Sequence, residues 1–103
     1  MTFPTQFTVI SSTTNATASG SANFAAIANK WSIQVVSSGQ NSLPTFNFFT
    51  STDGTDYSQV DPLNQTTNQF GDFFAFDTPA QYVQVTMGAN SGTVAVYAVA
   101  QSD

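Results

Sequence analysis

Three aspartates in one short polar stretch are the residues of this sequence best suited to chemistry. Asp53, Asp56 and Asp61 lie close together, and carboxylate oxygens are ligands that Ca²⁺ prefers. Their spacing differs from that of an EF-hand loop, because no glycine holds its sixth position and no glutamate closes it. The alternative is turn chemistry, in which Asp53 and Gly54 form the turn and Asp56 caps a backbone N–H. We expect no bound metal or other cofactor. If the protein does bind Ca²⁺, these three aspartates are the candidate ligands.

Catalytic groups are scarce in this chain. It contains no histidine, which removes the commonest metal ligand and the commonest general base, and no cysteine, which excludes disulfides and thiolate metal sites. Asp72 and Asp77 flank a phenylalanine-rich stretch and resemble a glycosidase pair in residue type alone. They more simply mark the solvated ends of a buried strand. The sequence therefore predicts a protein that is not an enzyme and has no catalytic residue.

The charge balance excludes several partners. Lys30 is the single cation against six aspartates, which gives a net charge of -5. Nucleic-acid binding needs several cations to displace counterions from phosphates, and an anionic membrane surface repels an acidic chain. No run of about 18 apolar residues marks a membrane span. We also expect no secretory signal, because the first residues have neither a basic segment nor an apolar one.

Apolar residues recur with a period of two along most of the chain, which is typical of half-buried strands. The length of 103 residues fits one domain, spanning 1–103. Residues 11–21 are expected to form a loop with at most a short edge strand. The expected strands cover residues 5–11, 22–28, 31–35, 43–50, 57–60, 73–76, 81–87 and 93–100. Residues 22–28 also fit a helical stripe, and we favour a strand because the neighbouring segments are all strands. These seven or eight short strands predict an all-β, single-domain antiparallel β-sandwich or jelly-roll.

The ten phenylalanines are the most informative residues of the composition. Successive side chains of a strand point to opposite faces, so Phe48-Phe49 and Phe73-Phe74 place aromatic rings on both faces of a sheet. Exposed rings on several strands favour a permanent protein interface made by these four residues. The alternative is coverage of both faces from within the chain, by residues 11–21 and 61–71.

Two further aromatic residues are candidates for ligand stacking. Trp31 begins an alternating strand and Tyr57 follows the Asp53-Gly54 turn. A sugar ring stacked on either, with asparagine and glutamine supplying hydrogen bonds, would indicate a glycan-binding module. The alternative for Trp31 is burial in the core, which is the commoner place for such a residue.

The order of motifs resembles a discoidin-like (galactose-binding-like) β-sandwich over roughly residues 31–100. The resemblance lies in Phe-Asn-Phe-Phe-Thr-Ser-Thr-Asp-Gly-Thr-Asp-Tyr (residues 46–57) and Thr-Pro-Ala-Gln-Tyr-Val-Gln-Val (residues 78–85). The strand that begins at Trp31 and the closing Ser-Gly-Thr-Val strand look like those of small phage virion proteins that carry this pattern. Gln84 stands where the family usually has arginine in its late strand, so the resemblance implies the architecture rather than the ligand.

These observations predict a non-enzymatic structural component of a phage virion, such as a capsid decoration or spike-base protein. We expect a homo-oligomer or permanent contacts with other virion proteins, and localisation in the virion. The alternative is a carbohydrate- or receptor-binding module at a virion or cell surface, with a surface glycan as its partner.

Overall fold

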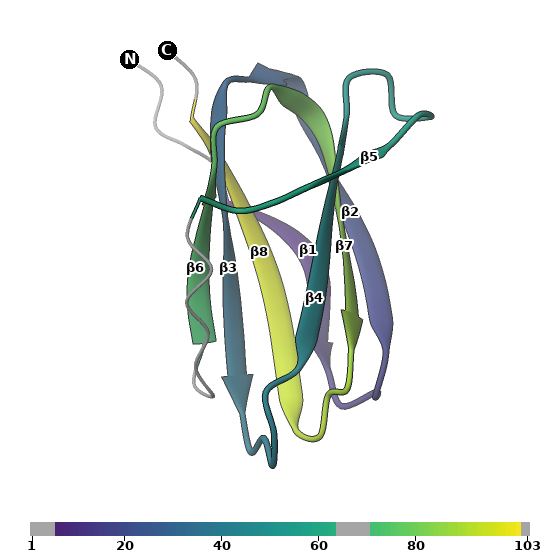
Figure 1. Cartoon of the computed structure of the whole chain (residues 1–103), viewed down its shortest axis with the longest axis vertical. Helices are drawn as coiled ribbons and strands as arrows, with labels where there is room; N and C mark the ends of the chain where they lie inside the picture. The colour runs from purple at the N-terminus through teal and green to yellow at the C-terminus, as the bar shows by residue number, and fades with distance from the viewer. Residues whose placement is uncertain (1–5, 64–70, 102–103) are drawn as a thin grey trace.

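A computed structural model describes residues 6–63 and 71–101 of the chain, and these residues form two antiparallel sheets (Figure 1). Eight strands make up this part of the molecule: β1 (Gln6–Thr13), β2 (Ala18–Ala28), β3 (Lys30–Ser38), β4 (Thr45–Ser51), β5 (Ser58–Val60), β6 (Gly71–Phe76), β7 (Ala80–Gly88) and β8 (Thr93–Gln101). The described residues include no helix of the length and hydropathy that a membrane crossing requires.

The strand order is that of a jelly roll. One sheet, here called sheet A, has the order β1-β8-β3-β6, and the other, sheet B, has the order β2-β7-β4-β5. The first four strands therefore pair with the last four in reverse, as β1 with β8, β2 with β7, β3 with β6 and β4 with β5. A long hairpin wrapped in this way gives two packed four-stranded sheets. The predicted all-β sandwich is confirmed.

The core lies between the sheets and follows from the period-two pattern. On β3, Trp31, Ile33 and Val35 are buried while Ser32 and Gln34 are only half-buried. Opposite residues on neighbouring strands share a face, so Ile33 lies beside Ala98 of β8 and Phe74 of β6. Sheet B supplies the facing layer, with fully buried Val83 and Val85 from β7.

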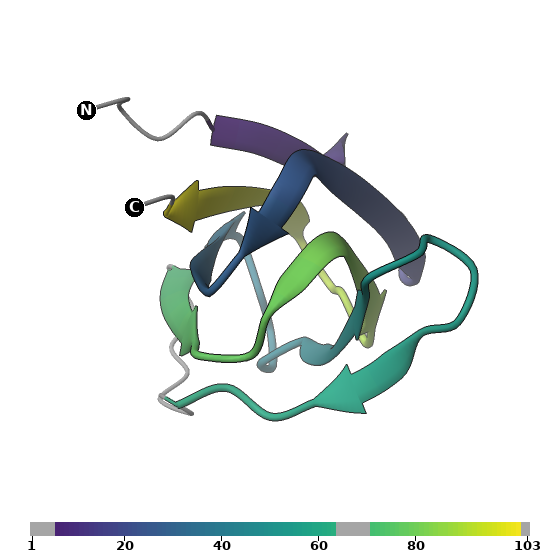
Figure 2. The same ribbon diagram turned by 90° about the horizontal axis from the view of Figure 1, so that it is seen from above.

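The two long sides of the sandwich differ. On one side β1 and β2 come so close that a methyl group on Gly20 would overlap the carbonyl oxygen of Val9. On the other side the chain leaves β5 and crosses from sheet B towards β6 (Figure 2). There the backbone N–H of Leu63 donates a 2.7 Å hydrogen bond to the carbonyl of Ala75.

The prediction of a loop over residues 11–21 was wrong. β1 continues to Thr13 and β2 begins at Ala18, so only the short connection between them is loop. Small residues hid this strand, because Ala18 and Gly20 face the core opposite Met87 and Val85 and carry no strong apolar signal. The strand expected over residues 22–28 is confirmed, with an irregularity at Ala25, whose φ is 70°.

Candidate functional site

The turn between β4 and β5 uses the first of the three candidate aspartates as a cap. The carboxylate of Asp53 accepts hydrogen bonds from the backbone N–H groups of Thr55 and Asp56, both at 2.9 Å. It also accepts one at 2.8 Å from the hydroxyl of Ser51. These donors, led by the Asp56 and Thr55 amides, hold the pKa of Asp53 far below its usual range. Gly54, with φ of 79°, completes the turn as predicted.

The three aspartates do not form a metal-binding cluster. The described part of the chain contains no group of three or more His, Cys, Asp or Glu side chains placed to share an ion. Turn capping is therefore the role that the geometry gives Asp53. The roles within the turn are reversed relative to the prediction, because Asp53 caps the N–H of Asp56. Asp61 lies beyond β5, in the segment that crosses towards β6.

The paired phenylalanines separate onto opposite faces, as their alternation predicts. Phe48 and Phe74 are each 4% exposed, and their ring centroids lie 5.0 Å apart between the sheets. Phe49 is half-buried on the outer side of sheet B, and Phe73 is 58% exposed on sheet A. Phe48 and Phe74 thus belong to the core of one chain, which leaves their rings little surface for a protein interface. An interface role for Phe49 and Phe73 stays a prediction.

The two residues proposed for ligand stacking lie in different settings. Trp31 is 3% exposed and stacks on Phe76, with ring centroids 4.0 Å apart and planes 6° from parallel. Its indole N–H donates a 2.7 Å hydrogen bond to the carbonyl of Thr78. An indole enclosed in this way offers no open face to a sugar, so the stacking role of Trp31 does not fit the structure. Tyr57 is half-buried at the end of the turn.

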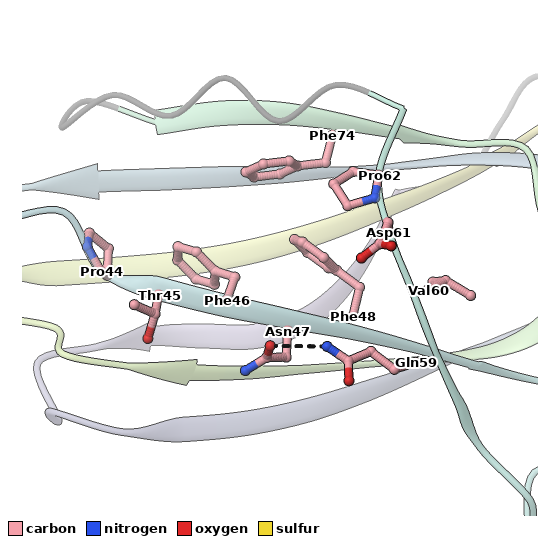
Figure 3. Close-up of a pocket in the computed structure, with 10 residues that line it drawn as sticks. All are labelled: Pro44, Thr45, Phe46, Asn47, Phe48, Gln59, Val60, Asp61, Pro62 and Phe74. Atoms are coloured by element: carbon pink, nitrogen blue, oxygen red, sulfur yellow. Dashed lines mark hydrogen bonds between the residues drawn. The ribbon is translucent and has the colours of Figure 1, made fainter.

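A groove of about 350 Å³ opens on the side where the chain crosses between the sheets (Figure 3). Phe46 and Phe48 of β4 and Phe74 of β6 line it, and Pro62 closes it from the crossing segment. The volume lies at the low end of ligand-binding pockets. Asp61 is the one carboxylate among its described lining residues. The groove therefore suits binding of an apolar group better than paired acid–base chemistry.

The outer faces of the two sheets have different chemistry, which the sequence reasoning missed. The outer side of sheet A carries apolar residues from three strands, here called the apolar face: Val36, Phe73, Ala75, Tyr97 and Val99. The outer side of sheet B carries uncharged polar and aromatic residues, here called the amide face: Asn23, Asn47, Phe49, Gln59, Tyr82 and Gln84. Alternation separates the faces of each strand, but only the register between strands assembles residues from different strands into these surfaces.

Comparisons with known proteins identify a structural relative. No protein-family model and no curated protein sequence matches the chain. The chain shares its fold with a prophage-derived protein. The crystal structure of the SPBc2 prophage-derived protein YomS superimposes with a TM-score of 0.75, over 99% of this chain and 97% of that one. The sequence identity is 18%, so the likeness shows a shared fold over the whole domain. The discoidin-like assignment stays a prediction.

Proposed function

We propose that this protein is a non-enzymatic structural component of a phage particle, held by permanent protein–protein contacts. The observation that carries the proposal is the jelly-roll fold shared over nearly the full length of both chains with a prophage-derived protein. The absence of histidine and cysteine from the sequence supports a role without catalysis. A capsid decoration or spike-base protein is the specific role that we favour.

The apolar face supports assembly with further protein. Val36 is 45% exposed on β3, and Tyr97 and Val99 lie on the neighbouring strand β8. An uncharged, partly apolar sheet surface is a feature of stable interfaces, because its contact with protein removes apolar area from water. We propose that this surface contacts a second copy of the chain or another virion protein.

Light scattering behind a sizing column tests the assembly proposal. We expect a defined oligomer for the wild-type chain and a shift towards monomer for Val36→Lys, which places a charge in the apolar face. Ser21→Lys is the matched control, since Ser21 is exposed on the opposite sheet. A wild-type chain that stays monomeric at high concentration contradicts self-assembly. Failure to bind purified phage capsids would then contradict the structural role as a whole.

The second candidate function is recognition of carbohydrate or of a receptor at a virion or cell surface. The amide face favours it, because amide groups and partly exposed aromatic rings lie together there without a charged neighbour in the strand rows that form it. Binding of the wild-type chain to a panel of purified oligosaccharides tests this function. No binding to any member would contradict it.

A further inference from the structure

The amide face is built around a cross-strand row on sheet B. Phe49 of β4 lies directly opposite Gln84 of β7 on one side and Gln59 of β5 on the other. Tyr82 lies two residues from Gln84 along β7, so it is a diagonal neighbour of Phe49. Asn23 of β2 is paired with Tyr82 and extends the surface to a fourth strand. Two aromatic rings and several amides therefore share one surface.

The amides of this surface have hydrogen-bonding capacity for a ligand. Gln59 donates from Nε2 to Oδ1 of Asn47 at 3.2 Å. Each amide has two N–H donors and an oxygen with two lone pairs. This bond therefore orients the two side chains and leaves the Asn47 amide nitrogen and the Gln59 carbonyl oxygen for further partners. Paired donors and acceptors of this kind match the hydroxyl groups of a sugar, which both donate and accept.

The aromatic rings of this surface are held in place. Tyr82 packs against the β4–β5 turn, where a methyl group on Gly54 would lie 3.1–3.3 Å from three carbons of its ring. That turn is itself tied together by the Asp53 carboxylate. Phe49 is half-buried between its two glutamine neighbours. Rings fixed in this way lose little freedom on binding, and their negative faces attract the C–H groups of a sugar ring.

The negative charge of the chain favours neutral sugars over anionic ones. All six residues of the amide face are uncharged, and the whole sequence has one cation against six anions. Sialylated, sulfated and phosphorylated glycans would meet an acidic protein without cations on this face to pair with. Neutral sugars meet no such repulsion.

We propose that the amide face of sheet B binds neutral oligosaccharides, with Phe49 and Tyr82 stacking on sugar rings and Gln84 hydrogen-bonding to their hydroxyl groups. The inference rests on the second candidate function, glycan recognition, and adds the location of the site and the class of ligand. Phe49, Tyr82 and Gln84 lie outside the lining of the groove between β4 and β6, whereas Asn47 and Gln59 belong to both surfaces.

Amide chemical shifts of the ¹⁵N-labelled full chain provide the test. The probes are cellohexaose, maltohexaose and chitohexaose, titrated to millimolar concentration, with a heparin hexasaccharide as the anionic control. We expect shifts to cluster at Phe49, Tyr82 and Gln84 with at least one neutral probe and not with heparin. Gln84→Ala should weaken that binding about five- to tenfold, the effect of one lost hydrogen bond.

Gln34→Ala is the matched control, because Gln34 is a half-buried glutamine on the outer side of sheet A. It should bind as the wild-type chain does. The proposed location would be overturned if Gln34→Ala and Gln84→Ala lost equal binding affinity. It would also be overturned if the chemical-shift changes clustered in the groove, at Phe46 and Phe74. Either result would leave glycan recognition itself standing. No shift with any neutral probe would overturn the site and its ligand class, whereas the second function as a whole is tested by the panel of oligosaccharides. The structural role is tested separately by light scattering.

Discussion

The side-chain nitrogen of Asn90, in the β7–β8 loop, donates a 2.8 Å hydrogen bond to the backbone carbonyl of Asn15, in the β1–β2 loop. The backbone N–H of Asn90 donates at 3.1 Å to the carbonyl of Ala16. Its carbonyl oxygen Oδ1 accepts from Nε2 of Gln40, in the β3–β4 loop, and from the N–H of Gly92 at 3.0 Å. One 6%-exposed side chain thus joins three loops at one end of the sandwich.

Asn90→Ala should lower the free energy of unfolding by about 2–3 kcal/mol, because it leaves partly buried polar groups of three loops without their partner. Chemical denaturation followed by the fluorescence of Trp31, the single tryptophan, measures this change. Asn29→Ala is the control, since Asn29 is exposed in the β2–β3 connection. Equal effects of the two substitutions would show that Asn90 does not organise this end of the fold.

Gly20→Ala should destabilise the protein by about 3 kcal/mol, since its methyl group would force the backbones of β1 and β2 apart at Val9. Gly88→Ala provides the comparison. Its methyl group would meet the movable Thr45 side chain at 3.1 Å, so the cost should stay below about 1 kcal/mol. Thermal melting of both variants shows which substitution destabilises the protein more. A tolerated Gly20→Ala would contradict the close approach of the sheets.

Adjacent phenylalanines of β4 should respond differently to truncation. Phe48→Ala removes a ring that lies 5.0 Å from Phe74 and 5.1 Å from Phe76, and should cost about 3–5 kcal/mol. Phe49→Ala empties no part of the core and should cost about 1 kcal/mol. Urea denaturation of the two variants measures the difference. Similar losses would mean that the register of β4 is shifted.

Stability should depend on pH through Asp53. The folded-state pKa of Asp53 lies below its ordinary value of 3.8, so the carboxylate stabilises the fold above that value. This contribution is lost as the pH falls below 3.8 towards the folded-state pKa. Asp53→Ala should therefore be less stable than the wild-type chain at neutral pH, with a gap that narrows in acid.

Asp53→Asn separates the charge from the hydrogen bonds at this position. The amide oxygen of the asparagine can still accept hydrogen bonds from the N–H groups of Thr55 and Asp56. The asparagine side chain, however, has no group that titrates in this pH range. Melting temperatures between neutral pH and pH 3 should fall less for Asp53→Asn than for the wild-type chain. Parallel curves for these two proteins would exclude Asp53 as a source of the pH dependence.

The sequence by itself determined the fold class and most of the strands. Apolar residues alternate with polar ones along Trp31–Val35 and Gln81–Met87 because one face of each strand lies in the core. Every β-sandwich requires this alternation, whatever its strand order. The Asp53-Gly54 turn could be predicted from the sequence for the same reason. The positive φ of Gly54 and the Asp53 carboxylate that accepts from Asp56 involve only residues a few positions apart. Such features need no knowledge of distant parts of the chain.

Tertiary structure alone decided where β2 begins, which ring of each phenylalanine pair is buried and which residues share the amide face. Ala18 and Gly20 are strand residues because β7 pairs with them and β1 leaves no room for a larger side chain. Trp31 is enclosed because Phe76 lies against its ring. Each outcome depends on strands far apart in the sequence, whose order and register are set by packing of the whole core.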